Sequence, residues 1–362
     1  MVIEQYTITT TPKYNFPQPT IDTTLPQRFL EQSLYSLKQV QPHQPFQLNQ
    51  QPFQQFHTLE QYPSTLRLKR TPIALKPNHQ ETIIAAVDTS TIKIGETTTG
   101  IIIAIRGATT WKQNRHYRYT RLGPFIFHIT EENKNEVYNT LERAYFNTSY
   151  SSNRPASPHL MQMPTRLASL LERWLQTMLT RTLSQGLILF DGSLTAGTFD
   201  TPAQRMKEIL SNARINRSTV LAFSKMTTLR VNGYLITDQL PKHEPPYLLE
   251  TTGLRCKPPM IPLGDVYVAR LNKAKYAFRL DIDREIPLPL RTDAVEKLLG
   301  NDLTMQGYPE TLRLAHILCT FTANEVLAIK HFITRKHGIQ IINRPDMHRL
   351  LFGPFGKGEI YS

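Results

Sequence analysis

The chain has 362 residues, of which 40% are hydrophobic, enough to bury the core of one large domain or of two smaller ones. Its 42 Lys and Arg residues against 29 Asp and Glu residues give a formal charge of +13, which favours polyanionic partners such as nucleic acids. With only two cysteines, Cys256 and Cys319, the composition excludes a disulfide framework and a zinc site made of four thiolates, so we expect a reducing compartment.

The first residues, MVIEQYTITT, lack the basic and apolar segments of a secretory signal, and no uninterrupted apolar run reaches the roughly 18 residues of a membrane span. We therefore expect a cytoplasmic protein that does not enter a membrane. Residues 39–61 are rich in Gln with interspersed Pro and Phe, a composition that favours neither a packed helix nor a regular strand. We predict an N-terminal extension or arm over residues 1–75, one folded domain over 76–345 and a C-terminal tail over 346–362.

The first part of the predicted domain is rich in strands. In TIIAAVDTSTIKIGETTTGIIIAIRGA, residues 82–108, two β-branched apolar runs flank a turn-prone segment and predict a hairpin. Residues 115–130 alternate well enough for a third strand. Helices are predicted over 133–146 and over 165–183, where Thr165 follows Pro164 as the expected N-cap.

The second part mixes strands with helices. A short apolar strand, 187–190, is followed by a helix that opens at Pro202 and by a strand over 218–225. Residues 265–283 predict a hairpin. A helix starts at Pro309, and a last helix has a capping box from Thr322 to Glu325 and a stop at Gly338. This order predicts an α/β domain with a mixed sheet flanked by helices.

Two of the predicted strands end in the same way. IIAAVDTS and LILFDGS each place an Asp, a small residue and a Ser after an apolar run, at Asp88 and Asp191. Because functional crevices in open α/β sheets lie beyond strand ends, the two carboxylates are expected to meet if their strands are neighbours. Adjacent carboxylates repel each other and attract a cation, and oxygen ligands suit Mg²⁺ or Mn²⁺. The alternatives are a turn at Asp191 and a cap or turn at Asp88.

Several motifs in this order resemble the NurA nucleases. They are VDTS, LILFDGSL, AFSK, YAFRLDI and GYPETLRLAHILC, and the resemblance spans roughly Ile83 to Gly338. It implies an RNase H-like sheet, a homodimer and a site that uses Mn²⁺ or Mg²⁺. It also implies a single-strand endonuclease and 5′ to 3′ exonuclease that resects and repairs DNA ends with a HerA-like hexameric ATPase. Two features depart from the family pattern: Thr89 stands where the family usually has Gly, and the Gln-rich arm is foreign to its compact members.

The resemblance also implies the ligands of the metal. Asp88 and Asp191 match the family's metal-binding aspartates, Glu172 best matches its acidic residue on the preceding helix, and His316 matches its histidine. All four are thus predicted to be both catalytic and metal-binding. The alternative for Glu172 is a solvated residue at the edge of a helix. The alternative for His316 is a core histidine bonded to a backbone carbonyl.

Lys225 ends the strand STVLAFSK as the aspartates end theirs, so its ammonium group is predicted to neutralise a scissile phosphate, with a solvent-facing lysine as the alternative. Asp281 and Asp283 alternate on one face of a strand. Either could supply a further ligand, or merely pair with Arg279 or Arg284.

Basic and aromatic residues interleave in RGATTWKQNRHYRYTR, residues 106–121, a mixture that can follow phosphates and stack bases. A second basic run follows between residues 205 and 230. The predicted nucleic-acid-binding residues are Lys112, Arg115, Arg118, Tyr119, Arg214 and Arg217. The alternative for the first run is a solvated edge hairpin whose charges prevent pairing with other strands.

The sequence therefore predicts a metal-dependent deoxyribonuclease. It contains no GxxxxGK[ST] phosphate loop, so any ATP-driven movement of DNA is expected to come from a partner. One alternative is a non-catalytic nucleic-acid-binding adaptor that keeps the fold, and another is an RNase H-like enzyme that acts on RNA or on hybrids.

Overall fold

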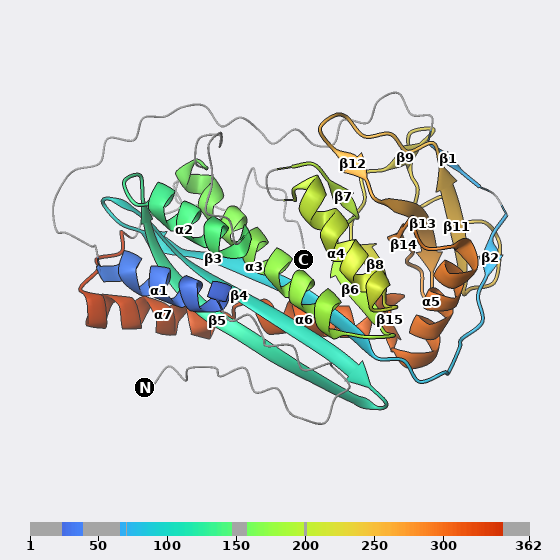
Figure 1. Ribbon diagram of the computed structural model, residues 1–362, viewed down its shortest axis with the longest axis horizontal. Coiled ribbons are helices and arrows are strands. Elements are labelled where there is room, and N and C mark those ends of the chain that lie inside the picture. Colours follow the sequence, from blue (N-terminus) through green and yellow to red (C-terminus); the bar gives the residue numbers. More distant parts are fainter. Residues whose placement is uncertain (1–23, 39–65, 70, 147–157, 199–200, 343–362) are drawn as a thin grey trace, which may run out of the picture.

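The computed structural model describes residues 24–38, 66–69, 71–146, 158–198 and 201–342. The Gln-rich stretch, residues 39–61, and the predicted tail, 346–362, lie outside these ranges. The described part is built around a ten-stranded mixed sheet, in the order β1-β11-β13-β14-β8-β6-β3-β4-β5 with β2 also paired to β11 (Figure 1). Its strands are β1 (Arg67–Leu68), β2 (Ile73–Ala74), β3 (Ile84–Glu96), β4 (Gly100–Gln113), β5 (His116–Thr130), β6 (Leu187–Asp191), β8 (Thr219–Ser224), β11 (Tyr247–Thr252), β13 (Gly264–Arg270) and β14 (Phe278–Asp283).

The centre of the sheet has the predicted topology. Strands β3, β4 and β5 are antiparallel, β6 pairs with β3 in parallel, and β8 pairs with β6 in parallel. In the RNase H-like arrangement, the first three strands are antiparallel, and two later strands lie parallel to the first one on the side away from the second. Strands β3, β4, β5, β6 and β8 have this arrangement, so the predicted fold class is confirmed. The hairpin of β13 and β14 then continues the sheet antiparallel from β8.

Helices cover both faces of this sheet. On one face α2 (Lys134–Phe146), α3 (Met163–Thr182) and α4 (Ala203–Ile215) close a core that contains Val87 and Phe190. On the other face α5 (Leu288–Asn301) and α6 (Glu310–Cys319) cover Ala86, Leu189 and Phe223. Because successive strand residues point to opposite faces, the two cores take alternate residues of the same strands. Both faces of the sheet are buried under helices, which explains the continuous apolar runs of β3, β4 and β6.

The remaining elements are short, apart from the last helix, α7 (Ala323–His337). Three small antiparallel pairs lie outside the main sheet, two of them local hairpins, and one 3₁₀ turn, η1 (Leu160–Gln162), precedes α3. The pairs are β7 (Thr195–Ala196) with β12 (Ile261–Pro262), β9 (Arg230–Val231) with β10 (Tyr234–Leu235), and β15 (Thr304–Met305) with β16 (Tyr308–Pro309).

Two helix ends test the predicted caps. In α7 the Thr322 side chain and Glu325 form the predicted capping box, and Gly338 ends the helix in the left-handed region at φ 64°. The predicted N-cap at Thr165 is wrong, because α3 begins at Met163 with Gln162 before it and contains Pro164 in its first turn. Proline is tolerated there since the first amide groups of a helix have no acceptor inside the helix.

An unpredicted helix, α1 (Thr24–Lys38), lies along β5, the edge strand of the sheet (Figure 1). Leu25 and Phe29 join the core under α3, whereas Leu37 joins a cluster on the other face together with residues of α7. Like strands β1 and β2, α1 belongs to the predicted extension, residues 1–75, and these parts pack onto the domain.

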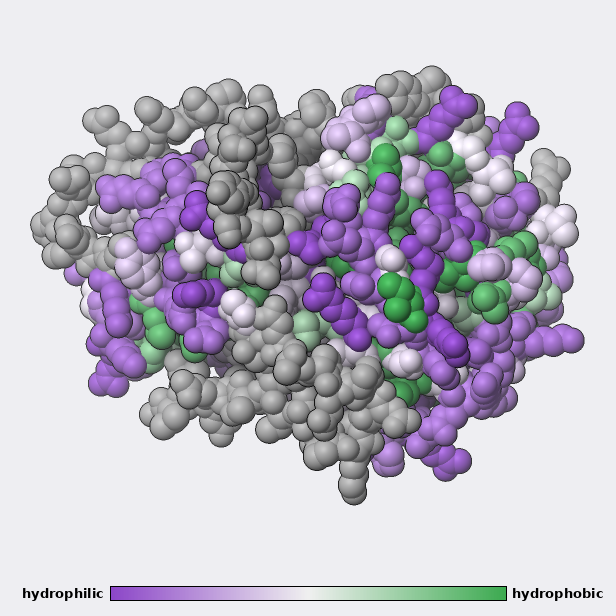
Figure 2. Space-filling view, in the orientation of Figure 1, coloured by the Kyte–Doolittle hydropathy of each residue, from purple (hydrophilic) through white to green (hydrophobic). Residues whose placement is uncertain are grey.

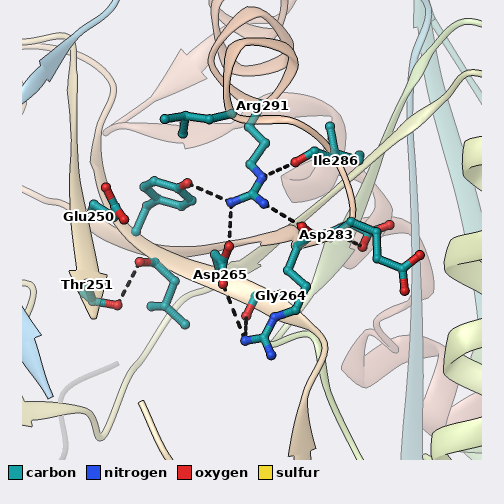
Figure 3. Close-up of polar contacts among 12 residues, drawn as sticks. Glu250, Thr251, Gly264, Asp265, Asp283, Ile286 and Arg291 are labelled. Carbon is teal, nitrogen blue, oxygen red and sulfur yellow. Dashed lines mark hydrogen bonds and ion pairs between the residues drawn. The ribbon is translucent and has the colours of Figure 1, made fainter. Parts of the chain in front are cut away.

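Arg291 fixes α5 against the outer strands of the sheet (Figure 3). Its guanidinium group bonds the Asp265 carboxylate at 2.5 Å and the Tyr267 hydroxyl at 3.2 Å, and it donates to the carbonyls of Ile286 and Arg284 at 2.6 Å each. An arginine with this many partners can hold two segments in one geometry.

At the other end of α5, Asp302 fixes the segment that leads into α6. Its carboxylate accepts hydrogen bonds from the backbone N–H of Leu303 at 2.9 Å, from that of Thr311 at 3.0 Å and from the Tyr117 hydroxyl at 2.7 Å. Asp302 therefore joins α5, the start of α6 and the hairpin of β4 and β5, and so determines where α6 crosses the sheet.

By length and composition, the stretch Glu310–His337 could cross a membrane. It is interrupted between α6 and α7, and Leu312 and Ala315 of α6 are buried against the sheet. Figure 2 shows mainly hydrophilic side chains over the described surface in view, with small separate hydrophobic patches. A helix that packs in the core of a protein can meet the same criteria of length and composition as a membrane span. The stretch therefore does not decide the location of the protein, and the cytoplasmic location stays a prediction.

Candidate active site

Three charged side chains lie side by side on neighbouring parallel strands. Asp191 is the last residue of β6, whereas the predicted strand end at Asp88 is wrong, because β3 continues to Glu96 in pairing with β4. Val87 of β3 pairs with Phe190 of β6, so Asp88 and Asp191 occupy adjacent positions, about 4.8 Å apart across the strands. Lys225 directly follows β8, the next strand. On each strand the residues two and four positions earlier belong to the core under α6. By strand alternation, the three side chains therefore project toward the α6 face.

Asp88 is buried and carries two hydrogen bonds. One carboxylate oxygen faces Nδ1 of His316 at 2.7 Å, and the other accepts from the backbone N–H of Thr89 at 2.8 Å. Burial raises the pKa of Asp88 above its usual value and the charge of Asp191 raises it further, while His316 and Lys225 act in the opposite direction. A cation at this position would remove the repulsion.

Asp191 is bonded to Lys225. The ammonium nitrogen lies 2.8 Å from a carboxylate oxygen, and both side chains are partly exposed. Gly192 follows at φ +99°, a conformation that residues with a Cβ rarely adopt, and its N–H donates to the carbonyl of Phe223. The chain bends at Gly192, whereas Asp191 is the last residue of β6 and its carboxylate is bonded to Lys225, so no turn is seen at Asp191 itself.

Glu172 reaches the site from α3, on the opposite face of the sheet. Its side chain is 18% exposed and accepts hydrogen bonds from Gln176 at 3.0 Å and Arg173 at 3.3 Å. Burial raises the pKa of Glu172, Arg173 lowers it, and the charges of Asp88 and Asp191 raise it again. Glu172 is therefore held and partly buried rather than solvated, and it lies within electrostatic range of both aspartates.

His316 comes from α6, and its imidazole side chain is 50% exposed. Its bond to Asp88 differs from the buried, carbonyl-bonded histidine that was the alternative. Of the five side chains predicted to act in catalysis, Asp88 is bonded to His316 and Asp191 to Lys225, and the charges of both aspartates act on the pKa of Glu172. Their roles in catalysis stay predictions.

Two residues outside the predicted set also belong to this cluster. Cys319 is buried one helical turn after His316, and ligand atoms of Asp88, His316 and Cys319 all lie within 4.8 Å of one another. The spacing of three residues between His316 and Cys319 predicts a shared helix face and could have identified the cysteine.

Tyr308 is the second missed residue, although it belongs to the GYP motif. Its ring packs edge-on against Phe278 with centroids 5.2 Å apart, and Lys225 lies 6.0 Å from its centroid. The residue is buried, and its hydroxyl is hydrogen-bonded to Asp191. Burial raises the pKa of Tyr308, and so do the nearby charges of Asp191 and Asp88.

Asp281 and Asp283 point to the face of the sheet that α3 and α4 cover, and arginines hold both carboxylates, so neither is a ligand of the site. Asp281 pairs with Ala222, whose side chain lies in the core under α3 and α4. Its carboxylate takes two bonds of 2.7 Å from Arg279 and a third, of 3.0 Å, from the N–H of Leu194. Asp283 is ion-paired with Arg214. Of the two alternatives, the structure shows the ion pairs, with Arg279 and Arg214 rather than Arg284 as partners.

The predicted nucleic-acid-binding residues fall into two groups. Arg115, Arg118 and Tyr119 are exposed near the tip of the hairpin of β4 and β5, and Lys112 is half-buried with its ammonium group 5.1 Å from the ring centroid of Tyr117 (Figure 1). The second group lies at the end of α4. There Arg217 is exposed, whereas Arg214 is held by the carboxylates of Asp283 and Glu285.

No family model and no curated protein matches the chain. Similar solved structures include the NurA nuclease from Sulfolobus solfataricus, at 14% identity and a TM-score of 0.43 over 73% of this chain and 88% of that one. A second NurA structure has 9% identity and a TM-score of 0.37 over 74% and 92% of the two chains. Endonuclease V from Bacillus subtilis has 12% identity and a TM-score of 0.32 over 73% and 89%.

All three TM-scores are below 0.5, so the functional conclusions rest on the geometry of the site rather than on these matches. Two of the structures named above carry the name NurA, which is the family that the sequence motifs resemble.

Proposed function

We propose that the chain is a metal-dependent deoxyribonuclease, acting as a single-strand endonuclease and as a 5′ to 3′ exonuclease with Mn²⁺ or Mg²⁺. One observation carries metal-dependent hydrolysis: Asp88 and Asp191 stand side by side on adjacent parallel strands, one bonded to a histidine and the other to a lysine. The choice of DNA strand and the direction of cleavage come from the family resemblance of the motifs. Phosphodiester hydrolysis needs a water that can be deprotonated and positive charge near the phosphate, and this cluster supports both requirements.

The donor set fits a hard divalent cation. Burial and mutual repulsion raise the pKa values of Asp88 and Glu172, and a cation among these carboxylates would relieve that repulsion. Asp88, Asp191, Glu172 and His316 are the residues that would hold it. A bound Mn²⁺ or Mg²⁺ would supply an acidified water and would neutralise charge on the phosphate and on the leaving oxygen.

The other side chains act on the substrate directly. The partly exposed ammonium group of Lys225 is free to bind a phosphate oxygen on its solvent side while it stays bonded to Asp191. Nδ1 of His316 faces Asp88, so these two atoms can share a cation or a proton, and Nε2 can exchange a proton with the leaving oxygen. The Tyr308 hydroxyl, hydrogen-bonded to Asp191, would help to orient that carboxylate.

We also propose that the hairpin of β4 and β5 binds the DNA strand. Arg115 and Arg118 would contact phosphates, and Tyr119, with 57% of its surface exposed, would stack on a base. Lys112, Arg214 and Arg217 belong to the same proposal. Arg214 would have to leave its carboxylate partners before it could contact a phosphate.

The proposed setting is DNA end resection in the cytoplasm, as a homodimer that works with a HerA-like hexameric ATPase. This part rests on the family resemblance of the motifs and on the lack of a phosphate loop in the sequence. Light scattering on the purified chain would test the dimer. Co-purification with a HerA-like ATPase, and stimulation of cleavage by ATP in its presence, would test the partnership.

Cleavage of labelled single-stranded DNA in Mn²⁺ tests the central proposal. Asp88→Asn and Asp191→Asn keep the side-chain shape but remove the charge, and each should slow cleavage at least about 10²-fold. Asp293→Asn is the matched control, since Asp293 is in a partly exposed pair with Lys297 on α5. DNA binding without cleavage by the wild type would favour the adaptor, and faster cleavage of RNA or hybrid strands would favour the RNA-directed enzyme.

A further inference from the structure

We propose that Cys319 makes the site a binding site for thiophilic divalent ions such as Zn²⁺ and Cd²⁺, held by Asp88, His316 and Cys319. Such an ion would compete for Asp88 with the hard cation used in cleavage. The binding itself is independent of the proposed function. Only the predicted inhibition of cleavage rests on it.

The geometry supports a three-residue site. Ligand atoms of the three residues lie within 4.8 Å of one another, and in a tetrahedral zinc site with bonds of about 2.0 Å to nitrogen and 2.3 Å to sulfur they would be about 3.5 Å apart. Side-chain movements of about 1 Å would therefore close the site. The backbone need not move, because His316 and Cys319 are on the same turn of α6 and Asp88 faces both from β3.

Cys319 is buried next to the two other proposed ligands. Its Sγ donates to the backbone carbonyl of His316 at 3.2 Å. Burial raises the pKa of Cys319, and the charge of Asp88 raises it further. Because the thiolate is the ligand, binding of an ion would release the thiol proton to solvent.

Tyr308 borders the same site. Its buried hydroxyl is hydrogen-bonded to Asp191, and the charges of Asp191 and Asp88 raise its pKa together with burial. The site is therefore bounded by a polar group on the side of Asp191.

The donor atoms decide which ion is preferred. Sulfur and nitrogen donors favour Zn²⁺ and Cd²⁺, whereas carboxylate oxygens alone favour Mg²⁺ and Mn²⁺. Asp88 and His316 belong to both sets, with Cys319 in one set and with Asp191 and Glu172 in the other. The two kinds of ion should therefore exclude each other.

Titration of the full chain with Cd²⁺, without DNA, tests the site through the ultraviolet absorbance of a cadmium–thiolate bond. Wild type and Cys256→Ser should each bind one ion with this signal, and Cys319→Ser should lose it. Calorimetry should show Zn²⁺ affinity at least about tenfold lower in Cys319→Ser, with Mn²⁺ affinity changed by less than about threefold. Cys319→Ala, which buries no new hydroxyl, is the second variant if the serine variant folds poorly, and circular dichroism checks both.

An absent cadmium signal in the wild type, or equal Zn²⁺ affinity in the folded Cys319 variants, would overturn the site. A cadmium–thiolate signal in a wild-type chain that does not cleave DNA would support the site for thiophilic ions and refute the proposed nuclease activity. If both proposals hold, Zn²⁺ should inhibit Mn²⁺-dependent cleavage by the wild type, and Cys319→Ala should cleave at Zn²⁺ concentrations that stop the wild type.

Discussion

His128 makes the stability of the fold sensitive to mild acid. The side chain is 1% exposed on β5, and its Nε2 forms a 2.9 Å hydrogen bond with the Thr97 hydroxyl. Burial lowers the pKa of His128 from 6.5 to about 4. The unfolded chain therefore binds a proton at a higher pH than the folded chain does. Between these two pH values the unfolded state carries more protons, so the free energy of unfolding rises with pH and falls as acid is added.

The size of the effect follows from the two pKa values. At pH 7.5 the imidazole is neutral in both states and contributes almost nothing. At pH 5 the unfolded imidazole is mostly protonated and the folded one is not, which removes about 2 kcal/mol of stability, and the full loss near pH 4 is about 3 kcal/mol. That is a large share of the 5–15 kcal/mol typical of a whole domain.

Urea denaturation from pH 7.5 to pH 5, followed by circular dichroism, measures this loss. His128→Gln keeps a hydrogen-bonding side chain but cannot gain the proton, so its stability curve should be flatter than that of the wild type by about 2 kcal/mol at pH 5. His331→Gln, at an exposed position on α7, is the control and should not reproduce the change. Parallel curves for wild type and His128→Gln would refute the reasoning.

Three further predictions concern the site and its supports. Mn²⁺ at about 100 times its dissociation constant should stabilise the wild type by about 2.7 kcal/mol, measured as a thermal shift, and should not stabilise Asp88→Asn. Asp281→Asn leaves the buried Arg279 without its counter-charge and should cost about 3–5 kcal/mol in urea denaturation, whereas Asp265→Asn, at a more exposed carboxylate, should cost less. Replacing Arg115 and Arg118 by alanine should weaken single-stranded DNA binding and reduce the slope of its salt dependence by about 0.7 for each phosphate that the hairpin no longer neutralises, as measured by fluorescence anisotropy at several salt concentrations. An unchanged salt slope would contradict the proposed DNA binding by the hairpin.

The central strands and their ends could be predicted from the sequence because they depend on local patterns. Continuous apolar runs predict strands buried on both faces, and the aspartates directly follow two of these runs. Once β3 and β6 are parallel neighbours, strand alternation brings Asp88 and Asp191 together. The capping box of Thr322 and Glu325 could likewise be predicted from a local pattern, since all its atoms lie within one helical turn.

Features that depend on distant parts of the chain could not be predicted in this way. The face taken by Asp281 follows from the register of β14 on β8, which the sequence of the hairpin alone does not encode. The burial of Cys319 depends on where α6 crosses the sheet, and Asp302 and Tyr117 determine that position from elsewhere in the chain. Helix α1 packs on β5, roughly a hundred residues further along, and the low-complexity stretch between them hides the relationship.

The position of α1 has a practical consequence for shortened versions of the protein. Ser36 of this helix accepts a hydrogen bond from the backbone N–H of His128 at 3.1 Å, and the helix contributes side chains to the cores on both sides of β5. A fragment that begins at residue 76 would leave the outermost strand uncovered, with apolar side chains and backbone groups open to strands of other molecules. Such a fragment should precipitate or form swapped assemblies, so expression trials intended for crystals should retain the chain from before Thr24.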